Sequence, residues 1–197
     1  MRHHNLIPSL LALVLGASAS NTAMAHGGLY ARAGLGLGFY NVSFDASDDT
    51  GLEGLMVPVE VLLGGSLVPG LVVGGAVSFD YAPAPSGQAG GIELKVDISQ
   101  FLLALGPFVA WYPDPDGGWH VQARAGWGRL ETSAQEASLD GEDPSGVVVS
   151  AGGGYDVWVS DTLGIGGLVR LTYAPLAHED LSYPTVAVNL LASLTYY

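Results

Sequence analysis

The chain of 197 residues contains no cysteine. This absence excludes a disulfide framework and a thiolate metal site. Charge is also scarce: Asp, Glu, Lys and Arg make up only 13% of the residues, about half the ~25% usual in soluble globular domains. Hydrophobic residues make up 49%, yet no stretch beyond the N-terminal region approaches the ~18 consecutive apolar residues of a membrane-spanning helix. The apolar residues are therefore distributed over strands.

Positive charge is the scarcest of all. Six Lys and Arg stand against 19 Asp and Glu, which gives a net charge of −13 at pH 7. Nucleic acid is therefore excluded as a partner, because it requires a basic surface. The 29 glycines follow no three-residue period, which excludes collagen. The length suits a single domain.

The N-terminus has the pattern of a secretory signal. Arg2 supplies a short positive region, an apolar run lies within residues 6–16, and Ala23-Met24-Ala25 fits a small-x-small cleavage site. A membrane anchor would need a longer run. We expect a cleaved signal peptide over 1–25 and one domain over 26–197.

Eight segments alternate between an apolar and a glycine-rich or polar residue. In residues 29–40, Leu, Ala and Phe occupy the odd positions and Gly, Tyr and Arg the even ones. A period of two indicates a strand whose two faces meet different surroundings. The predicted strands are 29–40, 55–65, 71–81, 98–112, 119–130, 147–158, 163–173 and 185–196.

The connections between these strands alternate in length. Long polar connections (41–54, 82–97, 131–146 and 174–184) alternate with short turns (66–70, 113–118 and 159–162). This layout is typical of an outer-membrane barrel, with long loops outside the cell and short turns in the periplasm. An open sheet edge would leave backbone groups unpaired in hydrocarbon. We therefore predict an all-β fold, a closed eight-stranded antiparallel transmembrane β-barrel in the bacterial outer membrane. A soluble lipocalin-like barrel, with the faces inverted, is the alternative.

Six predicted strands each carry one Asp, Glu or Arg on the polar face. A charge facing lipid at mid-depth costs roughly 2–4 kcal/mol, so this face must line the lumen. Three acids and three bases can neutralise one another there. The predicted lumen network consists of Arg32, Glu60, Asp80, Arg124, Asp156 and Arg170.

Aromatic residues lie toward strand ends and predict two girdles at the membrane interfaces. Trp119 and Trp127 are eight residues apart, which corresponds to about 20 Å across a tilted strand. The predicted girdle residues are Tyr30, Trp111, Trp119, Trp127, Trp158 and Tyr196.

The fourth predicted strand breaks the pattern. Apolar residues are even-numbered over 92–98 but odd-numbered from Phe101 to Trp111. Either a bulge near Ser99-Gln100 restores the phase, or residues 92–98 lie above the membrane. Pro58 and Pro107 also fall within predicted strands, where each removes a backbone donor.

Several stretches, 103–113, 119–121, 125–128 and 157–166, resemble small eight-stranded outer-membrane β-barrel proteins. In particular, the chain is similar to an uncharacterised family of exported bacterial outer-membrane β-barrel proteins. The resemblance implies the fold, with outer-membrane lipid and the assembly machinery as partners, and implies no activity. Such barrels commonly end in an aromatic residue, often Phe. This chain ends in Tyr196-Tyr197, and the terminal tyrosine is an imperfect match because the apolar face of the last strand is in phase with Tyr196.

His120, Gln122 and Arg124 share the polar face of one strand. They predict either a proton or ligand site, or a polar plug bonded to Glu60 or Asp156; the narrow interior of an eight-stranded barrel favours the plug. Ser150 and His120 are the candidates for a hydrolase, but nothing in the sequence brings them together, so we expect no enzyme. His178-Glu179-Asp180 is read as a solvated loop rather than a metal site.

Acidic residues gather in the predicted outer loops, where they form an acidic surface that divalent cations can bridge to anionic lipid. The predicted outer-loop acids are Asp45, Asp48, Asp49, Asp140, Glu142 and Asp143. We expect a monomer without cofactor or resident metal, with a structural or surface-interaction role. A narrow pore or carrier for small solutes is the alternative, favoured by the glycine-rich lumen faces, and a lipid-modifying enzyme is the third possibility.

Overall fold

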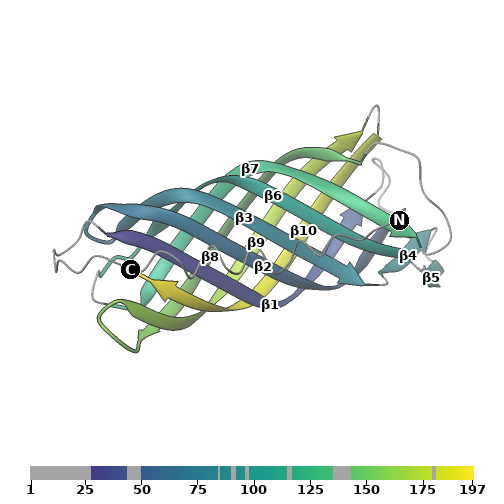
Figure 1. Ribbon diagram of the computed structural model, residues 1–197. Coiled ribbons are helices and arrows are strands. Elements are labelled where there is room, and N and C mark those ends of the chain that lie inside the picture. The colour runs from purple at the N-terminus through teal and green to yellow at the C-terminus, as the bar shows by residue number, and fades with distance from the viewer. Residues whose placement is uncertain are drawn as a thin grey trace, which may run out of the picture.

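The computed structural model describes residues 28–43, 50–83, 85–89, 92–95, 98–114, 117–134, 143–178 and 181–197. Eight long strands form a closed barrel (Figure 1). They are β1 (Leu29–Ser43), β2 (Thr50–Val68), β3 (Leu71–Pro83), β6 (Ile98–Trp111), β7 (Trp119–Ala134), β8 (Ser145–Trp158), β9 (Leu163–His178) and β10 (Leu181–Tyr196). The prediction of an all-β eight-stranded barrel is confirmed.

Closure comes from β1, which pairs antiparallel with both β10 and β2. Leu35, for example, lies opposite Ala192 on one side and Val59 on the other. The remaining long strands pair with their neighbours in chain order, so the wall is an up-and-down meander without a free edge. In the part of the chain that the structure describes, no helix is long and apolar enough to cross a membrane.

A short hairpin is added to the sheet beside the beginning of β2. Its first strand, β4 (Ser86–Ala89), pairs antiparallel with Thr50–Glu53 of β2, and its second strand, β5 (Ile92–Lys95), pairs with β4. The β3–β6 ladder runs without a register shift from Pro83 and Ser99 to Leu71 and Trp111. Of the two alternatives, the bulge near Ser99-Gln100 is therefore wrong. The phase changes because residues 92–95 belong to the hairpin, where no lipid imposes an alternation.

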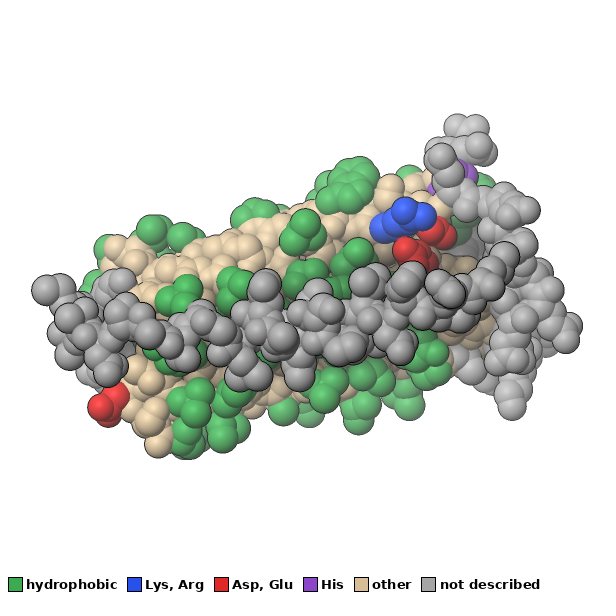
Figure 2. Space-filling model, in the orientation of Figure 1, with side chains coloured by type: hydrophobic (Ala, Val, Ile, Leu, Met, Phe, Trp, Pro, Cys, Tyr) green, Lys and Arg blue, Asp and Glu red, His purple; other side chains and the backbone are tan. Residues whose placement is uncertain are grey.

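Side chains alternate between lumen and exterior along every long strand. In β10, the odd-numbered residues from Thr185 to Thr195 are buried and the even-numbered ones between them are exposed. The exposed set is apolar, as with Leu190 and Leu194. Apolar side chains are spread along the visible wall, and the charged side chains seen there lie toward its two ends (Figure 2). The barrel is thus inverted relative to a water-soluble one, because its charged residues are buried inside and its outer face is apolar.

Of the five prolines in the barrel strands, Pro83 and Pro184 lie near strand ends, and each of the other three coincides with a break in one ladder. The β1–β2 ladder is interrupted at Pro58, the β6–β7 ladder at Pro107 and the β8–β9 ladder at Pro175. Because proline has no N–H, it cannot donate to that neighbour. On its other side each proline keeps its place in register, as Pro107 does opposite Gly75. One-sided pairing explains how the wall tolerates prolines.

The strands are longer than predicted at the hairpin end. Strand β2 begins at Thr50, β9 continues to His178, and β10 begins at Leu181. Most of the predicted long loop 174–184 is therefore strand, and that prediction is wrong. Outside hydrocarbon the ladder continues while the apolar alternation is no longer required, so the sequence pattern fades before the strand ends. At the opposite end the β2–β3 turn is only Pro69-Gly70, with Gly70 at φ 80°, a conformation that favours glycine.

Candidate functional site: the filled lumen

The middle of the lumen holds two clusters of charged side chains. The first, here called the Arg170 cluster, contains Arg170, Glu60, Asp80 and Arg124. Arg170 donates through Nη1 to Glu60 Oε2 at 3.0 Å and through Nη2 to Asp80 Oδ1 at 2.7 Å. All three of these side chains are buried, and β9, β2 and β3 supply them. One guanidinium thus holds two carboxylates that would otherwise repel each other.

Arg124 supplies the second positive charge of the Arg170 cluster. Its Nη1 lies 4.0 Å from Glu60 Oε2, and its Nε donates to Ser150 Oγ at 2.6 Å. The amide of Gln122 donates to the other Glu60 oxygen at 3.2 Å. Two arginines and two carboxylates make the cluster neutral, which a buried group of charges requires.

The second group, the Asp156 cluster, is built around one carboxylate. Arg32 Nη2 lies 3.5 Å from Asp156 Oδ1. Hydroxyl groups of Tyr112 and Thr195 donate to Oδ2 at 3.1 and 3.2 Å. Ser193 donates to Oδ1 at 3.4 Å and accepts a bond from Arg32 at 2.7 Å. This cluster is also neutral.

His120 belongs to the Asp156 cluster, and its neighbours fix its protonation. Arg32 Nη1 lies 2.5 Å from His120 Nε2. A guanidinium can only donate, so Nε2 accepts and the proton resides on Nδ1, which faces the Gly118 carbonyl at 3.3 Å. The imidazole is therefore neutral and tied at both nitrogens. This geometry suits a polar plug rather than a free ligand site.

Lumen-face glycines make room for these clusters. A Cβ at Gly154 would lie 2.8 Å from His120 Nε2, and one at Gly166 would meet the Asp156 carboxylate. A Cβ at Gly34 would lie 3.2 Å from Glu60 Cγ. The space that the glycines leave is therefore occupied by polar side chains from neighbouring strands. Glycine-rich faces are no evidence here for open volume.

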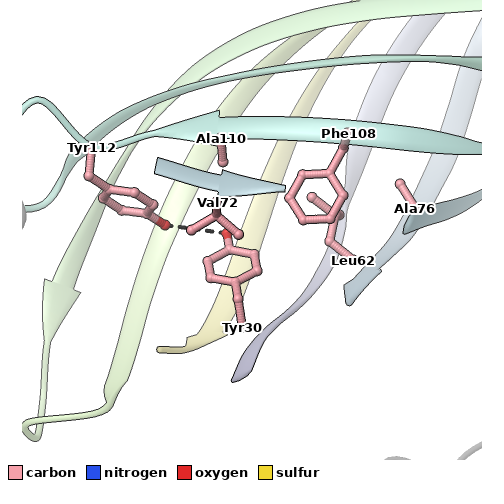
Figure 3. Close-up of a cluster of buried hydrophobic side chains, with 7 residues drawn as sticks. All are labelled: Tyr30, Leu62, Val72, Ala76, Phe108, Ala110 and Tyr112. Carbon is pink, nitrogen blue, oxygen red and sulfur yellow. Dashed lines mark hydrogen bonds between the residues drawn. The ribbon is translucent and has the colours of Figure 1, made fainter. Parts of the chain in front are cut away.

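Aromatic rings fill the lumen at the end that carries the short turns. The periplasmic plug, as we name it, consists of Tyr30, Tyr112, Trp158 and Tyr197. Figure 3 shows Tyr30 and Tyr112 pointing toward each other, with their hydroxyls 3.3 Å apart. The Tyr197 ring lies 5.7–6.2 Å from the other three rings, and its hydroxyl accepts a bond from the Gly70 N–H at 3.3 Å.

Two girdle predictions are wrong. Tyr30 is fully buried and Trp158 is half-buried, and both pack inside the barrel. Tyr30 has the phase of Arg32, and Trp158 has the phase of Asp156, so the alternation already placed both on the lumen face. Their position at strand ends is what suggested a girdle. The other four predicted residues, Trp111, Trp119, Trp127 and Tyr196, are exposed on the outer face.

Apolar clusters fill the lumen on the other side of the charged layers. One contains Tyr40, Val42, Leu52, Met56, Ala82 and Ala187, and the other contains Leu102, Ala104, Leu130, Val148, Ala174 and Leu176. Tyr183 packs against both. Together with the periplasmic plug, these clusters seal the charged layers from both sides.

A few buried polar atoms of the described residues remain without a hydrogen-bond partner, among them Arg124 Nη2, Asp80 Oδ2 and Ser78 Oγ. Arg124 also borders a hollow of about 10 Å³ beside Ala76 and Ala104. That volume is close to the minimum for one water molecule. The hollow is thus far too small for a solute path.

Few of the predicted outer-loop acids can be placed. Asp143 accepts two bonds from Arg129, at 2.9 and 2.5 Å, on the outer surface. Asp45, Asp48, Asp49, Asp140 and Glu142 lie outside the described residues, as does the predicted signal peptide 1–25. Among the residues that are described, no group of three or more His, Asp or Glu side chains is placed to hold a metal ion.

The candidate hydrolase pair does not assemble. Ser150 of β8 lies opposite Arg124 of β7. His120 also lies on β7, but it is four residues away from Arg124 and lies opposite Gly154. Four residues along a strand correspond to about 13 Å. Ser150 is bonded to Arg124, and His120 is bonded to Arg32.

Comparison with known proteins gives the fold of the chain but no activity. No protein-family model and no curated protein matches the chain. Among solved structures, Neisserial surface protein A (NspA) superposes with a TM-score of 0.55 at 13% identity, covering 88% of this chain and 99% of that one. This chain is a small outer-membrane β-barrel. OprG of Pseudomonas aeruginosa (TM-score 0.48, 12% identity, coverage 87% and 97%) and Ail of Yersinia pestis (0.42, 14%, 83% and 97%) are also similar.

The resemblance to small eight-stranded outer-membrane barrels is confirmed as a resemblance of fold. The closed wall with its apolar exterior places the protein in the bacterial outer membrane, since strands cross a membrane only as closed barrels. An identity of 13% is too low to carry activity across.

Proposed function

We propose that this barrel is a closed, non-enzymatic anchor that presents strand ends and acidic loops at the cell surface for interaction. The observation that carries the proposal is the filled lumen. Two clusters of charged side chains, each with no net charge, occupy its middle. The periplasmic plug of four aromatic residues closes one end, and apolar clusters occupy the other. A barrel sealed in this way is suited to holding strand ends and loops at the cell surface rather than to passing solutes.

Projection of the strands supports the proposal. Tyr173 is exposed on the outer face of β9, and the strand continues five residues further, to His178. At ~3.3 Å per residue and ~40° tilt, this adds roughly 13 Å beyond the aromatic level. The β4–β5 hairpin lies at the same end of the barrel (Figure 1). The described strands thus form a rim beyond the aromatic level, at the end where the sequence predicts the acidic outer loops.

Acidity determines what such a rim binds. Glu131 and Asp143 lie beside Arg129 on the outer surface, and the outer-loop acids of the sequence add to them. Carboxylate oxygens are preferred ligands of calcium and magnesium. We infer that divalent cations bridge the loops to anionic groups of surface lipid or of a partner surface.

Neutralising the outer loops tests the proposal. The variant replaces Asp45, Asp48, Asp49, Asp140, Glu142 and Asp143 by Asn or Gln. With the barrel in zwitterionic nanodiscs, its calcium-dependent binding to a supported bilayer of anionic lipid is expected to weaken by about tenfold or more, equivalent to ~1.4 kcal/mol. The control replaces Asp114 and Asp161, which lie in the short turns at the opposite end. Equal binding by the parent and the loop variant would contradict the proposal.

A narrow pore is the second candidate, favoured by the unpaired Arg124 Nη2 and the hollow beside it. We expect the purified, folded barrel to give no single-channel currents in planar bilayers. A Trp158→Ala variant should be silent too, because the two charged clusters still fill the lumen above the plug. Resolved current steps from either protein would establish the pore instead.

A further inference from the structure

The outer wall is not uniformly covered by bulky side chains. A trough of about 600 Å³ runs along the exterior where β6, β7 and β8 lie side by side. Its outward-facing lining residues are Val109, Trp111, Val121, Ala123, Ala151 and Gly153. Many outward-facing residues of the wall are Leu, Val or aromatic, whereas half of those that line the trough are Ala or Gly.

The floor of the trough is built by register. Ala123 lies opposite Ala151, and Val121 lies opposite Gly153, so three small residues adjoin across the β7–β8 ladder. On the β9 side, Leu171 and Val169 are paired with Ala151 and Gly153 and stand exposed. The small side chains of the floor therefore lie between β6 and β9, which present bulkier residues to the exterior.

Aromatic rings mark the periplasmic end of the trough. Trp111 forms part of one wall. Beyond Val121 on β7 comes Trp119, whose ring meets that of Tyr155 edge-on at 5.5 Å. Exposed tryptophans of this kind lie at the headgroup level of a bilayer. The trough therefore begins near the periplasmic headgroups and runs up into the hydrocarbon.

The surroundings of the trough determine what occupies it. It is continuous with the lipid-facing wall, so water does not fill it, and a void would forfeit dispersion contacts along its whole length. We propose that the trough binds one acyl chain of a phospholipid in the periplasmic leaflet, with its headgroup beside Trp111 and Trp119. This inference is independent of the surface role, because it concerns the opposite leaflet.

Gly153 offers a way to fill the trough without disturbing the barrel. The nearest heavy atom to a Cβ built there is His120 O at 3.8 Å, an ordinary contact. Gly75 is a matched control: it is exposed on β3, outside the trough, and a Cβ there meets nothing within 4 Å. Gly153→Leu and Gly75→Leu therefore make the same chemical change on the lipid face of two different strands.

Native mass spectrometry of the detergent-extracted barrel supplies the first test. We expect the parent and Gly75→Leu to retain one phospholipid through delipidation. The fraction of Gly153→Leu molecules that retain it should fall by about tenfold, equivalent to ~1.4 kcal/mol of binding. Equal retention by all three proteins, or retention by none, would overturn the proposal.

Fluorescence supplies the second test in a bilayer. One variant retains only Trp111 and another only Trp127, with the remaining tryptophans replaced by Phe. Phospholipid with brominated acyl chains should quench Trp111 at a lower mole fraction than Trp127, and Gly153→Leu should abolish this difference. Identical curves for the two tryptophans would refute a seated chain. Protection of Trp111 from quenching, together with crosslinked dimers, would show that a second copy of the chain fills the trough, and the proposal would fall.

Discussion

Replacing Arg170 by methionine is expected to lower the free energy of unfolding by about 3–5 kcal/mol, the cost of breaking a buried ion pair by removing one partner. Arg170 is fully buried and bonded to both Glu60 and Asp80. Without it the two carboxylates face each other, and only Arg124 remains nearby, at 4.0 Å from Glu60. The Arg170 cluster then carries an uncompensated negative charge in a lumen sealed at both ends.

Equilibrium unfolding in urea, with the barrel refolded into lipid vesicles, measures this loss. Arg129→Met is the matched control, because it removes an arginine bonded to Asp143 on the outer surface, where both partners are partly exposed. Exposed pairs contribute ~0–1 kcal/mol. The double variant Arg170→Met with Asp80→Asn keeps the cluster neutral and should recover most of the stability. If Arg170→Met costs no more than Arg129→Met, the lumen is solvated and the filled-lumen proposal fails with it.

The sequence predicted which residues face the lumen but not how they pair. Alternation is a local property of one strand, so it can be read without knowing the barrel. Pairing across the lumen depends on the stagger of all eight strands. Arg170 and Asp80, for instance, meet from strands β9 and β3, which do not adjoin in the wall. No spacing in the sequence separates the Arg170 cluster from the Asp156 cluster.

The periplasmic plug shows a different limit. The phase of Tyr30 and Trp158 in the sequence places both on the lumen face, whereas their position at strand ends indicates a girdle. The structure agrees with the phase, and the girdle prediction is wrong for both. Tyr197 lies after the last strand residue, so alternation said little about it. Its ring turns inward because its hydroxyl meets Gly70 and its backbone N–H donates to the Thr162 carbonyl at 2.9 Å. These contacts come from turns that the pattern of strands does not describe.

The outer face leads to the second large effect, an arginine placed in the apolar wall. Val169 is exposed near the middle of β9. We expect Val169→Arg to destabilise the folded barrel in a bilayer by about 2–4 kcal/mol, the depth-dependent cost of a cation at the midplane. Unfolding in urea from lipid vesicles measures this difference directly.

Ala177→Arg is the control, because Ala177 faces outward on the same strand, eight residues further and beyond Tyr173. There the side chain reaches water or headgroups, and the cost should fall to ~0–1 kcal/mol. The difference between the two variants isolates depth, since the strand, the face and the introduced residue are the same. A water-soluble barrel would tolerate both changes within ~0.5 kcal/mol, as surface substitutions do. Equal and small effects would therefore contradict a lipid-facing wall, whereas a steep difference would locate the hydrocarbon along β9.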